Sequence, residues 1–141
     1  EAGGWFKVKR VSRGAAFGDY DNDGDMDVVV VNNEVGASPV LLRNEQKGGR
    51  WLTVRVLTAA GSPDAIGARV LVEAGGAKQV REISRARSYL SSSDVRASFG
   101  LGEATRAERV TVSFPSGDEQ VVSDVPANTF LSVKEGQGRL P

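Results

Sequence analysis

Hydrophobic and polar residues alternate along much of the chain, with the two-residue period of a half-buried β-strand. No stretch has the longer period of an amphipathic helix. The pattern therefore predicts an all-β protein. The strands that we expect cover residues 5–11, 28–32, 40–42, 51–58, 68–73, 78–87, 109–114, 120–122 and 130–134.

Glycine-containing turns divide this pattern into units. Ala-Gly-Gly-Ala at 74–77 and Ser-Gly at 116–117 predict hairpin turns between neighbouring strands. About seven short strands joined by such turns are typical of a β-sandwich, which we place at residues 50–136. The polar stretch 45–49 predicts a linker, so that residues 1–46 form a smaller β unit before the sandwich.

The smaller unit contains four consecutive valines at 28–31. Such a run predicts a strand that is buried on both faces. Two or three strands bury too little apolar surface to be stable alone. We therefore expect this unit to dock on the following domain, on a second copy of the chain, or on further β units outside this sequence.

Aspartate occupies every second position of the loop directly before the valines. Carboxylates at this spacing repel one another by roughly 1 kcal/mol per close pair even in water, and a bound cation removes that penalty. Their oxygens suit Ca²⁺, which accepts about six to eight of them in a flexible shell, better than Mg²⁺. The loop 19–27 therefore predicts a calcium site, with Asp19, Asp21, Asp23, Asp25 and Asp27 as candidate metal residues.

The spacing also assigns a role to each aspartate. Alternate side chains of a tightly curled loop point inward, so the first three aspartates are expected to give one oxygen each. Gly24 stands where the chain must bend back sharply, and we expect a positive φ there. Asp25 then offers its backbone carbonyl, and Asp27 closes the shell with both carboxylate oxygens.

Two other interpretations of the loop are weaker. An EF-hand begins with a similar pattern, but it needs a glutamate at its twelfth position, where this chain has Val30. A solvated acidic turn would also use Asp, Asn and Gly. A turn gains nothing from five aspartates, so the metal loop is favoured.

Residues 16–31, followed by Leu-Leu-Arg-Asn at 41–44, resemble a VCBS/FG-GAP repeat. This is the calcium-loop blade unit of integrin-type β-propellers. The resemblance implies that residues 1–46 form part of a propeller-like blade around a calcium loop.

Four later motifs resemble the ASPIC/UnbV domain. Together with the first segment, they are similar in order to the C-terminal part of the cartilage acidic protein family. That domain commonly has a histidine where this chain has Ser98, so no role of that histidine carries over. The motifs lie at residues 64–70, 89–94, 99–102 and 114–117.

Composition excludes several functions. With 18 basic and 18 acidic residues, the chain has no net positive charge to attract nucleic acid. It contains no cysteine and no histidine, which excludes disulfides, the usual zinc sites, thiol nucleophiles and His-based triads. No apolar run approaches the roughly 20 residues of a membrane span. Calcium sites of modest affinity fill where calcium is plentiful, so we expect a secreted, periplasmic or cell-surface protein.

A basic stripe is the second candidate site. If residues 78–87 form one strand, Arg81, Arg85 and Arg87 lie on one side and could contact acidic or sulfated glycans. A solvated sheet face is the favoured alternative, because charged side chains usually face water.

The serine run Ser-Ser-Ser-Asp at 91–94 is the one stretch that resembles catalytic machinery. A serine nucleophile needs a neighbouring base, and with no histidine in the chain nothing positions one. We expect these side chains to bond to backbone groups in a turn instead.

The sequence thus predicts a calcium-binding adhesion or protein-interaction module that is not an enzyme. Its partner is a protein or a glycan. A calcium-dependent glycan-binding module is the first alternative. An accessory domain of a biosynthetic enzyme system is the second, because ASPIC/UnbV-like segments also occur in such systems.

Overall fold

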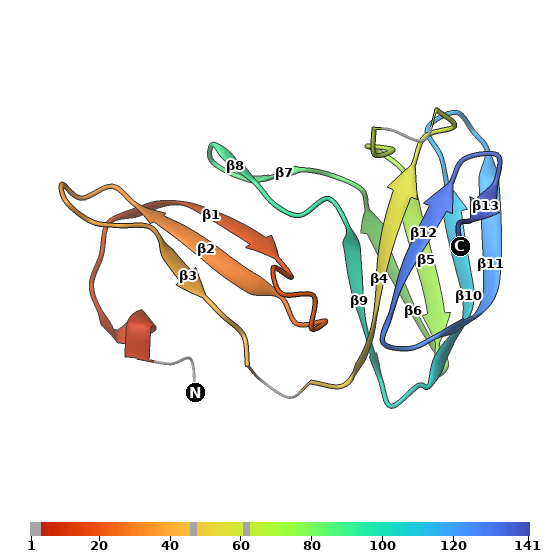
Figure 1. Ribbon diagram of the computed structural model, residues 1–141, viewed down its shortest axis with the longest axis horizontal. Coiled ribbons are helices and arrows are strands. Elements are labelled where there is room, and N and C mark those ends of the chain that lie inside the picture. Colours follow the sequence, from red (N-terminus) through yellow and green to blue (C-terminus); the bar gives the residue numbers. More distant parts are fainter. Residues whose placement is uncertain (1–3, 46–47, 61–62) are drawn as a thin grey trace.

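The computed structural model describes residues 4–45, 48–60 and 63–141, without the side chains of residues 87 and 88. Strands dominate, and the helical element of the described ranges is one short 3-10 helix, η1 (Gly4–Lys7). Figure 1 shows a small three-stranded sheet beside a larger body of two four-stranded sheets. The predicted all-β class is therefore confirmed.

The small sheet is antiparallel, with strand order β1-β2-β3. Its central strand matches the expected valine strand, and β3 matches the expected partner at 40–42. The turn between β1 and β2 is the aspartate loop. The strands are β1 (Ser12–Gly18), β2 (Asp27–Asn32) and β3 (Val40–Leu42).

The predicted strand at 5–11 is wrong. Residues Gly4–Lys7 form η1, and the amide of Val8 donates to the carbonyl of Trp5 at 3.1 Å. The first strand begins at Ser12, where β2 provides a partner. Alternation alone does not make a strand, because the backbone groups also need a neighbouring strand to pair with.

The valine run is not buried on both faces. Val30 is 7% exposed, but Val29 and Val31 are 39% and 49% exposed. These two residues alternate with Val30 along β2, so they lie on the opposite face of the sheet. The prediction failed because it assumed cover on both faces, and among the described residues one face of this sheet is largely open.

The larger body consists of two sheets with strand orders β11-β10-β5-β6 and β13-β12-β4-β9. Pairing is antiparallel except between β12 and β4, which are parallel. The strands are β4 (Arg50–Leu57), β5 (Arg69–Ala74), β6 (Ala77–Glu82), β9 (Ala97–Gly102), β10 (Arg106–Ser113), β11 (Glu119–Pro126), β12 (Thr129–Lys134) and β13 (Gly138–Arg139).

Both sheets contribute alternate residues to one hydrophobic core, as a β-sandwich requires. The hairpin turn at 74–77 has Gly75 and Gly76 at φ 56° and 80°, which suits a two-residue turn. The predicted β-sandwich is confirmed. Its fully buried side chains include Leu52, Val54, Val56, Val70, Val72, Phe99, Val110, Val112, Val125, Leu131 and Val133.

The predicted strand at 78–87 ends early, at Glu82. Ile83 turns into the core with 1% exposure, and its amide donates to the carbonyl of Ala68 at 2.8 Å. The chain then forms a separate two-stranded ribbon of β7 (Ala86–Ser88) and β8 (Ser91–Ser92). Burial of Ile83 therefore divides the expected strand.

The segment from β7 to Asp94 extends from the sandwich and contacts the small sheet (Figure 1). The amide of Asp94 donates to the carbonyl of Phe17 at 2.8 Å, and the amide of Phe17 donates to Ser93 Oγ at 3.2 Å. The guanidinium of Arg13 lies 4.8 Å from the centre of the Tyr89 ring. These contacts position the small sheet, and hence the aspartate loop, against the sandwich.

Candidate metal centre

The aspartate loop connects two paired strands, and this brings its ends together. Gly18 at the end of β1 pairs with Asp27 at the start of β2. Asn22 and Gly24 have φ of 58° and 97°, which curls the chain between them. The positive φ expected at Gly24 is confirmed.

Three of the candidate residues converge. Asp19, Asp21 and Asp27 each place a carboxylate oxygen within 4.8 Å of the others. Among residues 4–45, 48–60 and 63–141, this is the group of acidic side chains close enough to share one metal ion. Asp19 and Asp27 are only 4% and 2% exposed, so water stabilises their charges poorly.

Backbone amides orient the two buried carboxylates. The oxygens of Asp19 accept from the amides of Asp23 and Gly24, at 3.1 and 3.0 Å. Those of Asp27 accept from the amides of Tyr20 and Asn44, at 3.1 and 2.8 Å. A carboxylate oxygen has two lone-pair sites, so each retains capacity for a cation.

Asp21 differs, because both of its carboxylate oxygens are buried and neither accepts a hydrogen bond. Arg43 Nε lies 2.8 Å from its Oδ2. That contact is an ion pair by distance, although it lacks hydrogen-bond geometry. Asp21 raises the pKa of Arg43 more than any other group does. Buried carboxylate oxygens that accept no hydrogen bond are the kind of oxygen ligand expected around a cation.

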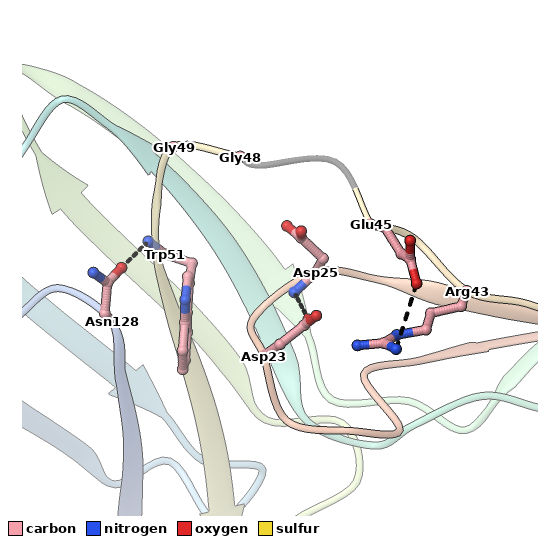
Figure 2. A pocket seen from close by; sticks show the side chains of 8 residues that line it. All are labelled: Asp23, Asp25, Arg43, Glu45, Gly48, Gly49, Trp51 and Asn128. Atoms are coloured by element: carbon pink, nitrogen blue, oxygen red, sulfur yellow. Dashed lines mark hydrogen bonds and ion pairs between the residues drawn. The ribbon is translucent and has the colours of Figure 1, made fainter. Parts of the chain in front are cut away.

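Asp23 and Asp25 lie outside the cluster, and their side chains line a neighbouring cleft (Figure 2). Asp23 Oδ1 accepts from the Asp25 amide at 3.0 Å. Burial raises the pKa of Asp25, and the charges of the other four aspartates raise it further. Trp51 and Asn128 of the sandwich form the opposite wall of the cleft. The carboxylate of Asp23, which we expected to bind the ion, therefore lies outside the cluster of Asp19, Asp21 and Asp27.

The sandwich supports the loop through a residue that the sequence analysis did not single out. Arg96 Nη2 donates to the backbone carbonyl of Asp19 at 3.0 Å, and Nη1 donates to Asn22 Oδ1 at 2.9 Å. The Asp-x-Arg pattern at 94–96, directly before β9, is a weak signal for such a group. Sequence alone does not show that it meets a loop 77 positions earlier.

Of the candidate basic residues, Arg81 and Arg85 do not lie on one strand, because β6 ends at Glu82. Arg85 donates to Asp64 at 2.9 Å, and Arg55 donates to the same carboxylate at 3.0 Å. Arg81 lies apart on β6, with its guanidinium 5.8 Å from the centre of the Phe99 ring. The side chain of Arg87 lies outside the described part of the structure.

Ser91 and Asp94 of the serine run make the local bonds expected of a turn, whereas Ser93 bonds to the small sheet. Ser91 Oγ donates to the carbonyl of Tyr89 at 3.0 Å, and Asp94 Oδ1 accepts from the amide of Arg96 at 2.9 Å. Ser93 Oγ accepts from Phe17, as described above. Each of these side chains therefore has a structural partner.

The fold and the loop define an all-β protein in which a β-sandwich carries a smaller sheet with a clustered acidic loop. The family model described as ASPIC and UnbV matches residues 58–140, more than half of the chain, so the chain belongs to this family. No curated protein matches the chain significantly in sequence. No helix within the described ranges is long and apolar enough to cross a membrane.

The match begins after β4, although β4 pairs with β12 and β9 inside the sandwich. Leu52, Val54 and Val56 of β4 are fully buried in the shared core. The sandwich as a folded unit therefore starts at Arg50, ahead of the matched residues.

Proposed function

We propose that the chain is a calcium-binding adhesion or protein-interaction module that performs no catalysis. The observation that carries this proposal is the convergence of Asp19, Asp21 and Asp27, with both oxygens of Asp21 buried and without a hydrogen bond. Three carboxylates in a partly dry site repel one another, so a divalent cation stabilises their folded arrangement.

Calcium is the cation that the donor set favours. All candidate ligands are oxygen atoms, and backbone carbonyls and water can complete a flexible shell of about six to eight. Softer metals prefer thiolates and imidazoles, and the chain contains neither cysteine nor histidine. Asp19, Asp21 and Asp27 would hold the ion directly. Asp25 would contribute its backbone carbonyl.

We extend the proposal to the small sheet, which we interpret as a VCBS/FG-GAP-like repeat spanning residues 1–46. Support comes from an acidic loop that joins two antiparallel strands and from a third strand beside them. The similarity to the cartilage acidic protein family stays a prediction. A calcium site of modest affinity favours a secreted, periplasmic or cell-surface location.

An interaction role is supported by the open face of the small sheet. Val29, Val31 and Leu41 are large apolar residues on neighbouring strands, and each is exposed. Contiguous apolar surface of this kind marks protein contacts more often than chemistry. We therefore assign the cation a structural role beside a protein-binding face.

Calorimetric titration of the chelator-treated protein with CaCl₂ tests the proposal, with MgCl₂ as the comparison ion. We expect saturable calcium binding with one strong site, and weaker binding of magnesium. Asp27→Asn should abolish it, because this residue is the most buried member of the cluster. Asp124→Asn is the matched control, since Asp124 forms only an exposed ion pair with Arg106. Absence of binding by the unmodified protein, or unchanged binding by Asp27→Asn, would refute the proposal.

A further inference from the structure

Arg96 connects the sandwich to the aspartate loop through two hydrogen bonds. One goes from Nη2 to the backbone carbonyl of Asp19 at 3.0 Å, and the other goes from Nη1 to Asn22 Oδ1 at 2.9 Å. Asp19 belongs to the carboxylate cluster, and Asn22 holds the left-handed backbone conformation in the middle of the loop. A single side chain of the sandwich therefore fixes the loop at its start and at its bend.

The sandwich holds this arginine in place from several sides. Its Nε donates to Asp94 Oδ2 at 2.8 Å, and its Nη2 lies 2.6 Å from the same oxygen. The guanidinium also lies 5.3 Å from the centre of the Phe130 ring on β12, a strand of the sheet that contains β9. Only 23% of the Arg96 side chain is exposed. A planar guanidinium with its donors fixed in this way imposes a geometry on the groups that it contacts.

Asp94 adds a second line of contact between the same two parts. Its amide donates to the carbonyl of Phe17 at 2.8 Å. A Cβ atom added to Gly18 would lie 3.2 Å from Asp94 Cβ, so the chains approach closely there. The segment 94–96 thus runs directly against the entrance of the loop.

We infer that Arg96 is a positioning residue of the metal loop, so that the cation affinity of the loop depends on its docking to the sandwich. This inference rests on the proposed calcium site. In the docked state Arg96 holds Asp19 and Asn22 in the arrangement that brings the three carboxylates together. By thermodynamic linkage, cation binding must in turn favour docking.

The sign of the effect separates positioning from simple electrostatics. A positive charge near a cation site opposes cation binding, so an arginine that acted only through its charge would weaken the site, and its removal would strengthen binding. Asp94 neutralises most of that charge locally. A positioning role predicts the opposite result, namely that removal of Arg96 weakens binding.

The first experiment is calorimetric titration of the full chain with CaCl₂. We expect Arg96→Gln to bind calcium about 10-fold more weakly than the unmodified protein, as is typical for residues that orient metal ligands. Arg106→Gln is the matched control, because its ion pair with Asp124 lies on the exposed surface. It should bind as the unmodified protein does. Equal or tighter binding by Arg96→Gln, or equal weakening by the control, would overturn the inference.

A second variant covers the case in which Arg96→Gln folds poorly. Asn22→Gly keeps a residue that tolerates positive φ and removes the oxygen that Arg96 contacts. We expect weaker binding here too, and the losses of the two variants should not add in the double variant. Additive losses would contradict a shared contact.

Hydrogen exchange of the Asp94 amide supplies a readout other than affinity. That amide bonds to Phe17 across the two parts. Calcium should slow its exchange in the unmodified protein and much less in Arg96→Gln. If the unmodified protein binds calcium and this amide does not respond, the inference fails while the proposed function stands. If the unmodified protein binds no calcium, both fail.

Discussion

Gly24 of the aspartate loop packs directly against the indole ring of Trp51 in β4. A Cβ atom at position 24 would overlap the ring atoms, so no other residue fits here without movement. Gly24 also has φ of 97°, which L side chains rarely adopt. One glycine therefore meets two requirements, the bend of the loop and its approach to the sandwich.

Gly24→Ala tests this relationship. We expect it to lower the free energy of unfolding by about 2 to 4 kcal/mol, because backbone strain and overlap with Trp51 add together. Gly36→Ala is the matched control, since Gly36 has φ of 80° and no atom within 4 Å of the added Cβ. The control should cost only about 1 to 2 kcal/mol. Urea unfolding measures both, and equal losses would show that the Trp51 contact contributes nothing.

Two aspartates of the loop should respond differently to loss of charge. Asp21→Asn should weaken calcium binding at least about 10-fold, since its buried oxygens lie in the carboxylate cluster and accept no hydrogen bond. Asp25→Asn should have a mild effect, because its carboxylate lies outside the cluster. Calorimetric titration compares them. Equal losses would refute the assignment of a backbone role to Asp25.

Calcium removal should lower stability. With a dissociation constant on the order of 10 to 100 μM, calcium at about 1 mM adds roughly 1.4 to 2.7 kcal/mol to the free energy of unfolding. The corresponding change in melting temperature is about 4 to 8 °C. Differential scanning calorimetry in calcium and in EDTA measures it. The Asp27→Asn variant should show no such difference, and an equal response by that variant would place the effect elsewhere.

The sandwich could be predicted from sequence because its strands carry their burial pattern locally. Leu52, Val54 and Val56 alternate along the chain and are all buried in the core. The strand at 78–87 could not be predicted in full, since nothing local indicates that Ile83 leaves the sheet to enter the core. Alternation shows which residues share a face but does not identify the neighbouring strand.

The candidate site, like the fold, could be predicted from the sequence only in part. The convergence of Asp19, Asp21 and Asp27 is predicted by the spacing of the aspartates, because two paired strands bring the ends of the loop together. The same spacing wrongly places the Asp23 carboxylate among them. The contribution of Arg96 depends on a contact between residues 77 positions apart. Such a contact is fixed by how the two parts pack, and a single sequence does not encode it in any local pattern.

The buried carboxylate of Asp64, which pairs with Arg55 and Arg85, predicts that the free energy of unfolding depends on pH. Burial alone would raise the pKa of Asp64, but the hydrogen bonds and positive charges of Arg55 and Arg85 together outweigh it and hold the pKa below its usual value. The stabilisation from a lowered pKa is complete above the unfolded-state value of about 3.9 and is lost as pH falls through the folded-state value.

Asp64→Asn should therefore cost about 1 to 2 kcal/mol at neutral pH. Its deficit relative to the unmodified protein should shrink once the pH falls below about 4. Urea unfolding from pH 7 to pH 3 measures this change. Asp124→Asn should stay within about 0.5 kcal/mol of the unmodified protein throughout. A deficit of Asp64→Asn that does not change with pH would contradict the ion-pair explanation.

We propose that a calcium ion in the loop 19–27 orders the small sheet against the sandwich. Hydrogen–deuterium exchange of the full chain, with calcium and with EDTA, tests it most directly. We predict that calcium slows exchange across β1, β2 and β3, and at the amide of Asp94, while β10 and β11 in the sandwich stay unchanged. Identical exchange of the small sheet in calcium and in EDTA, in a protein that calorimetry shows to bind calcium, would show that the ion does not order this sheet.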